Sequence, residues 1–290
     1  MPARLTAALC ALTAAVALAI AAAPASADTD GGDFVIEYGH FNKANRKAAS
    51  ILRRSGAMEA VAAEINARWA LPADVPIYIS DEIPVGPAFI PDLTLDDGTV
   101  VPDFIAVPGK FLTLELKEMR RQLKGVRGIT PAEAMIAANE FVVAHEMGHA
   151  LVHSLTLPVT GKEEDAVDGF AAYLLADNPK FGPFTAFSAA MFFDAIARLR
   201  GRLTAADFAD EHSILEQRVY QFLCWIYGSD QRRFKSLVTT KLLPRARAVR
   251  CGDEWKQVTT SWGTLLAPHA LAPAPPAAPP APAPAPAPTR

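Results

Sequence analysis

The residues most suited to chemistry lie in one stretch, NEFVVAHEMGHALVHS (139–154), which holds three of the six histidines in the chain. On a helix, His145 and His149 lie about 40° apart around the axis and about 6 Å apart along it, so both imidazoles can bind one tetrahedral metal ion. Glu146 is rotated by about 100° from His145, where its carboxylate can reach a water on that metal without binding the metal itself. The spacing H-E-x-x-H therefore predicts a zinc site with hydrolytic chemistry. The alternative is a helix with partly exposed histidines.

A catalytic zinc site needs a third protein ligand and keeps a fourth position for water. His153 continues the four-residue series. It would lie about 12 Å along the helix from His145, which is too far for one ion to join all three rings. We therefore expect His153 to pack or to orient a ligand rather than to bind this metal.

The segment GKEEDAVDGFAAYLL (161–175) offers a better third ligand in Glu164. Asp168 lies on the same face of a predicted second helix, where it can accept the N–H of a ligating histidine and so fix the orientation of the ring. Glu163 and Asp165 are not excluded as ligands, although both positions fit a solvated face.

A third segment, DEHSILEQRVYQF (210–222), places a histidine just ahead of a predicted helix. Ser213 and Glu216 form a capping-box pattern, so the helix is expected to begin directly after His212. From such a loop, His212 could stabilise the oxyanion of a tetrahedral intermediate, with Asp210 or Glu211 holding its ring. The alternative is a histidine that serves only in a helix-entry turn.

The helices and strands expected around these residues indicate an α+β fold. In the N-terminal part we expect helical residues over 42–70 with a break near Ser55-Gly56, a strand at 75–80 and mostly loop over 81–103. KFLTLELKEM (110–119) alternates apolar and polar residues and is a strand candidate, with a helix as the alternative. From the capping sequence Thr130-Pro131-Ala132-Glu133 onward the chain is mainly helical. Further helices are expected at 163–176, 184–199, 205–210, 213–226 and 230–240, and near 253–263.

The two ends of the chain do not fit a folded domain. Residues 1–27 carry one arginine, an apolar run and Ala25-Ser26-Ala27, which predicts a secretory signal peptide cleaved near Ala27. Residues 267–290 are rich in alanine and proline and predict a solvated, disordered tail. One domain is expected over 28–266, with an α+β part at 28–129 and a helical part at 130–266 that carries the metal site.

Composition excludes some partners. The chain has 28 basic and 31 acidic residues, with no basic run, so nucleic acid is not an expected partner. No stable membrane span is expected after signal cleavage. Cys224 and Cys251 remain without the signal peptide, and an even count in an exported chain predicts one disulfide, with two free buried thiols as the alternative.

HEMGH followed by E-x-x-x-D resembles the gluzincin branch of zinc metallopeptidases, which bind zinc through two histidines and a glutamate on a second helix. A closer resemblance is to a family of secreted bacterial proteins that are described as metallopeptidases by inference and are classed as a domain of unknown function. HEMGHALVH, EEDAVDGFAAYLL, DEHSILEQRVYQFLCWIYGSD and RARAVRC carry this resemblance, over about 139–251. A zincin-like fold is what it implies. The N-terminal half departs from the family, which has a Cys-containing Asn-Ala-Phe-Tyr segment where this chain has GPAFIPD (86–92).

Together these patterns predict a secreted or periplasmic metallopeptidase with one Zn²⁺ per chain, acting on a peptide or protein substrate. His145, His149 and Glu164 would bind the metal, Glu146 would act as general base and His212 would assist. Substrate is expected to lie along an edge strand, for which KFLTLELKEM is the candidate. The alternatives are a catalytically silent zinc-binding envelope protein and an interaction module tethered by the proline-rich tail.

Overall fold

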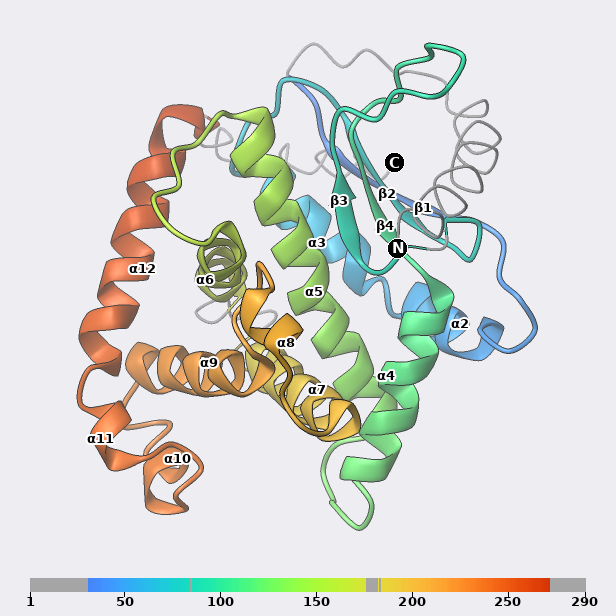
Figure 1. The fold of residues 1–290 in the computed structure, drawn as a ribbon. Coiled ribbons are helices and arrows are strands. Elements are labelled where there is room, and N and C mark those ends of the chain that lie inside the picture. Colours follow the sequence, from blue (N-terminus) through green and yellow to red (C-terminus); the bar gives the residue numbers. More distant parts are fainter. Residues whose placement is uncertain (1–30, 84, 176–181, 183, 272–290) are drawn as a thin grey trace, which may run out of the picture.

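The computed structural model describes residues 31–271 except 84, 176–181 and 183. It has an α+β architecture, with a small sheet at one side and helices over the rest of the molecule (Figure 1). The predicted signal peptide and the tail beyond Leu271 lie outside the described residues. None of the helices in the described ranges combines the length and the apolar character that crossing a bilayer requires.

The sheet has four strands in the order β1-β2-β4-β3. Strands β1 (Phe34–Tyr38), β2 (Val75–Ile79) and β4 (Phe104–Val107) are parallel, and β3 (Ala88–Ile90) pairs antiparallel with β4 at the edge. Helices α2 (Arg46–Ser55) and α3 (Ala57–Asn66) connect β1 to β2 and are separated by Gly56, whose φ of 65° ends the first helix. The break near Ser55-Gly56 and the strand at 75–80 are confirmed.

The segment KFLTLELKEM is a helix, so its prediction as an edge strand was wrong. It forms most of α4 (Gly109–Gln122). Leu112, Leu116 and Met119 are buried at helical spacing against the core, and this period outweighs the partial alternation. The edge strand that packs beside α5 is instead β3, within a stretch that was expected to be mostly loop.

Helix α5 (Pro131–Ser154) runs through the centre of the molecule (Figure 1). The Thr130 hydroxyl accepts a hydrogen bond from the Glu133 N–H at 3.2 Å, and the Glu133 carboxylate accepts one from the Thr130 N–H at 2.7 Å, which confirms the capping box. The helix is apolar on nearly all sides because it packs against the sheet on one side and against α4, α6 and α7 on others.

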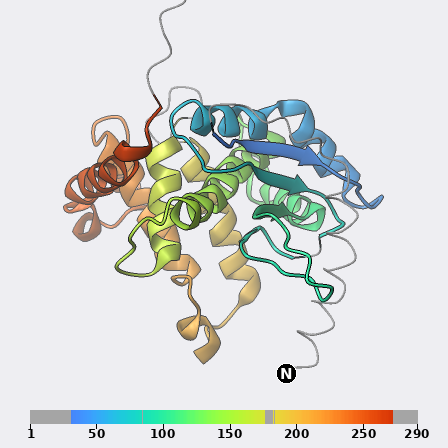
Figure 2. The same ribbon diagram turned by 90° about the horizontal axis from the view of Figure 1, so that it is seen from above.

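The helices that follow α5 lie beside the sheet and do not cover its face, as the two perpendicular views show (Figure 2). This helical half comprises α6 (Glu163–Leu175), α7 (Phe184–Arg200), α8 (Ala205–Ala209), α9 (Leu215–Ser229), α10 (Ser236–Thr239), α11 (Arg245–Ala248), α12 (Cys251–Leu266) and the short 3-10 turn η1 (Ala267–His269). The predicted disulfide is present between Cys224 of α9 and Cys251 of α12.

Two of the expected helices differ from the structure. Helix α9 begins at Leu215 after Ile214, because the Ser213 hydroxyl donates to Asp165 at 2.9 Å instead of capping the helix. Within 230–240 only α10 is helical, since turns occupy the preceding residues. The packed chain also extends beyond 266: the Leu271 N–H donates to the Arg68 carbonyl at 2.9 Å.

Candidate metal centre

Helices α5 and α6 bring two imidazoles and one carboxylate to a common point. Glu164 Oε2 lies 3.1 Å from His145 Nε2 and 3.3 Å from His149 Nε2, and one ligand atom from each residue lies within 4.8 Å of the others. A tetrahedral ion with bonds of about 2.0 Å separates its ligand atoms by about 3.3 Å. The donor types and their spacing therefore fit one such ion.

A glycine allows the two helices to approach this closely. Gly148 is buried on α5 between the two histidines, and a Cβ atom placed there would lie 2.9 Å from Val167 Cβ and 3.1 Å from a ring carbon of Phe170. Val167 follows Glu164 by one turn of α6. The absence of a side chain at 148 thus sets the separation that puts the Glu164 carboxylate against the rings.

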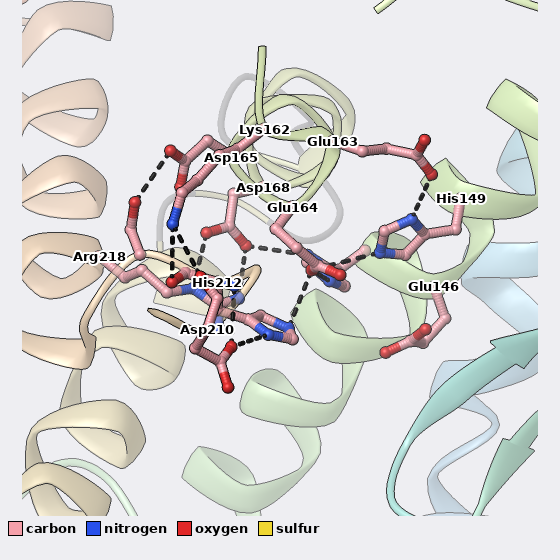
Figure 3. Close-up of polar contacts among 12 residues, drawn as sticks. Glu146, His149, Lys162, Glu163, Glu164, Asp165, Asp168, Asp210, His212 and Arg218 are labelled. Atoms are coloured by element: carbon pink, nitrogen blue, oxygen red, sulfur yellow. Dashed lines mark hydrogen bonds and ion pairs between the residues drawn. The ribbon is translucent and has the colours of Figure 1, made fainter. Parts of the chain in front are cut away.

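Asp168 lies behind His145, as the sequence predicts. The His145 Nδ1–H donates to Asp168 Oδ1 at 2.9 Å, which leaves Nε2 directed at Glu164. Asp168 is buried and is held in turn by Arg218 of α9, whose Nε–H and Nη2–H donate to its two carboxylate oxygens at 2.8 and 2.7 Å. Three helices therefore contribute to the orientation of one ring, and Figure 3 shows the Asp168 and Arg218 side chains that form this pair.

His149 also has a carboxylate partner behind it. Its Nδ1 lies 2.7 Å from Glu163 Oε1, although the Glu163 side chain is 46% exposed. Glu163, which the sequence left open as a ligand, is thus partly exposed and contacts His149 from the first residue of α6. Asp165, by contrast, accepts the hydrogen bond from Ser213 on the far side of the helix.

The charges within the centre reinforce one another. Burial lowers the pKa of His145, but its hydrogen bonds to Asp168 and Glu164 outweigh burial and raise this pKa to about 9. Burial raises the pKa of Glu164, but hydrogen bonds from His145, His149 and His212 hold it well below its usual value. Carboxylates therefore surround both rings, and such an environment favours a bound cation, either a proton or a metal ion.

His212 reaches the same carboxylate from the loop before α9. Its Nε2 lies 2.9 Å from Glu164 Oε2, and its Nδ1 lies 3.0 Å from Asp210 Oδ1. Lys162 anchors this loop, because its Nζ donates to the carbonyl oxygens of Asp210 and His212, both at 3.1 Å. The sequence did not indicate Lys162, and its only signal was a position just ahead of the acidic face of α6.

Glu146 lies apart from this group, toward the edge strand (Figure 3). Its Oε2 accepts a hydrogen bond from the backbone N–H of Phe89 in β3 at 2.8 Å. One pocket of about 570 Å³ is lined by His145, Glu146, His149, Glu164 and His212, together with residues 87–89 and 91. The edge strand therefore forms a wall of the pocket that holds the candidate metal centre.

His153 does not join the centre in the described part of the chain. It is directed at Asp92 and Asp103, at the base of a hairpin that follows β3.

Comparison with known proteins identifies the family of this chain. A search of curated proteins and a search of solved structures each found no match. Residues 39–266 match the sequence model of the family DUF4344, which is described as "Putative metallopeptidase". This match covers well over half of the chain, which therefore belongs to the family DUF4344.

Proposed function

We propose that the protein is an exported zinc-dependent peptidase that uses the α5–α6 centre to hydrolyse peptide bonds. Family membership supports a metallopeptidase. The finer assignment depends on one observation, the convergence of His145 Nε2, His149 Nε2 and a Glu164 oxygen beside Glu146 in a single pocket.

In this proposal His145, His149 and Glu164 hold one Zn²⁺ and leave a fourth position for water. The bound ion would supply a Lewis acid that polarises a peptide carbonyl and makes water more acidic. Asp168 and Glu163 keep the Nδ1–H of each histidine occupied, so that both Nε2 atoms face the ion. Glu146 removes the proton from the attacking water and passes it to the leaving amine.

His212 would donate a hydrogen bond to the negative charge that develops on the carbonyl oxygen. Its place in the same pocket and its anchoring by Asp210 and Lys162 support this role. The substrate would lie along β3, because this is the edge strand beside the centre and its Phe89 N–H already faces the pocket. A substrate strand beside β3 would give a zincin-like arrangement. Residues 110–119 are then excluded as the substrate-binding strand, because they form helix α4.

Export is supported by the signal-like sequence at 1–27 and by the Cys224–Cys251 disulfide, since disulfides persist in oxidising compartments. We place the mature enzyme outside the cytoplasm, secreted or in the periplasm, with the proline-rich tail as a spacer.

The proposal is tested by zinc analysis paired with cleavage of a proteome-derived peptide library. The wild type should bind zinc and cleave. Glu146→Gln should keep the metal and lose activity by at least about 10²-fold, whereas the exposed control Asp253→Asn should keep both the metal and full activity. Full activity in Glu146→Gln would exclude the general-base role. Zinc without cleavage in the wild type would instead favour a catalytically silent binding protein.

The ligand set has its own test on adjacent residues of α6. Glu164→Ala should lose far more zinc than Glu163→Ala, because only Glu164 is directed at both Nε2 atoms. The reverse order would show that the third ligand is Glu163.

A further inference from the structure

A second group of metal-binding side chains lies outside the candidate centre. His153 Nε2 is 3.4 Å from Asp103 Oδ2 and 3.7 Å from Asp92 Oδ2, and the three ligand atoms all lie within 4.8 Å of one another. The shorter separation is close to the value of about 3.3 Å between ligands on one tetrahedral ion. The side chains of Asp92 and His153 are 82% and 38% exposed, so water can complete the coordination.

These residues come from two elements that are separate in sequence. Asp92 follows β3 and Asp103 directly precedes β4, so the two aspartates form the neck of the hairpin 92–103. The Asp92 N–H donates to Asp103 Oδ1 at 3.1 Å and closes this neck. His153 lies in the last turn of α5. An ion bound by all three would therefore join the hairpin to the helix.

The ligand types select a class of ion. Two carboxylates balance the charge of a divalent cation, and one imidazole favours zinc and other transition ions over Mg²⁺ and Ca²⁺, which prefer oxygen ligands alone. We propose that Asp92, Asp103 and His153 bind a second Zn²⁺-class ion, which clips the neck of the 92–103 hairpin to the end of α5.

The clip would act on the edge strand. The rings of Phe89 and His153 have centroids 5.7 Å apart, and the Phe89 N–H donates to Glu146. An ion at the neck thus fixes β3 against α5 two residues away from the strand's end. This consequence for substrate binding rests on the proposed function, whereas the binding of the ion does not.

The first test counts zinc. Dialysis of the full chain against rising free Zn²⁺ should give two ions per chain in the wild type, one tight and one weaker. His153→Gln and Asp103→Asn should each bind one ion. The matched control Asp96→Asn, an exposed aspartate in the same hairpin, should still bind two. One ion in the wild type, or two in His153→Gln, overturns the proposal.

A second readout does not depend on catalysis. Hydrogen exchange at 88–103 should slow when the weaker site fills in the wild type and in Asp96→Asn, but not in His153→Gln. In Glu164→Ala, which removes a ligand of the first centre, this zinc-dependent protection should remain. Protection that is independent of zinc would show that His153 forms only ion pairs with the aspartates. If Glu146→Gln cleaves normally while the hairpin still responds to zinc, the proposed function fails and the second site stands.

Discussion

Arg218 binds Asp168 with two parallel hydrogen bonds, and Asp168 in turn accepts the Nδ1–H of His145. Both members of the pair are buried, and the paired charges together keep the pKa of Asp168 below its usual value although burial raises it. The ring of a candidate metal ligand on α5 is thus oriented by a guanidinium on α9 through the carboxylate that both of them contact.

Replacing Arg218 should therefore weaken metal binding without removing a ligand. Arg218→Lys cannot form the bidentate pair, so Asp168 loses its fixed orientation, and we expect the zinc dissociation constant to rise by about 10- to 100-fold. Competition with a chromogenic chelator measures this value. The exposed Arg232→Lys serves as the control, and an unchanged affinity in Arg218→Lys would argue against the positioning role.

Gly148 provides a prediction about helix packing. Gly148→Ala introduces a Cβ atom 2.9 Å from Val167 Cβ, which must push α6 away and cost about 1–3 kcal/mol of unfolding free energy. Zinc affinity should fall with it, because Glu164 moves with α6. Adding Val167→Ala should restore part of both losses. Gly161→Ala is the control, since a Cβ atom there meets nothing within 4 Å; equal effects of the two alanines would refute the argument.

His212 can be assigned by separating binding from turnover. If it stabilises the oxyanion, His212→Gln should retain zinc and lower kcat by about 10²- to 10³-fold. Loss of zinc in this variant would make His212 a fourth ligand, an outcome that its 2.9 Å separation from Glu164 makes worth measuring. Parallel measurements of zinc content and steady-state kinetics distinguish the two roles.

Glu140 on α5 predicts a pH dependence of stability. Burial raises the pKa of its carboxyl to about 7. A carboxyl whose pKa is higher in the folded state stabilises the fold fully below its unfolded pKa, and this contribution is lost as the pH rises through about 7. Relative to wild type, Glu140→Gln should thus gain on the order of 3 kcal/mol in unfolding free energy between about pH 4 and pH 8. Denaturant unfolding at both pH values tests this, with the exposed Glu59→Gln as control. The same difference in unfolding free energy between Glu140→Gln and wild type at both pH values would contradict the prediction.

More of the candidate metal centre than of the sheet could be predicted from the sequence. His145, Glu146 and His149 follow from helical spacing, and Glu164 and Asp168 from the same period on a second helix, so their proximity required only that two helices pack. Arg218 and Tyr220, on the predicted helix after His212, are only weaker site candidates from the sequence, and the pairing of Arg218 with Asp168 was not predicted because the two are 50 residues apart. Long-range pairs of this kind have no local signature.

The edge strand was missed for a different reason. β3 has only three residues and lies in a proline-rich stretch, and its pairing with β4 depends on a partner that follows the whole hairpin. Conversely, 110–119 carries a partial alternation that resembles a strand, and burial of Leu112, Leu116 and Met119 shows that the helical period decides. Short strands are set by tertiary pairing, which local patterns do not contain.

The end of the described chain contacts the segment between α3 and β2. Ala270 and Trp69 form an antiparallel β-bridge, and the Leu271 N–H donates a hydrogen bond to the Arg68 carbonyl. The segment after α12 is therefore hydrogen-bonded to the turn after α3. A movement of the helical half away from the sheet would first have to break these backbone hydrogen bonds. Under the proposed function, these contacts would favour an extended peptide as substrate, because such a peptide can enter the pocket without an opening of the fold.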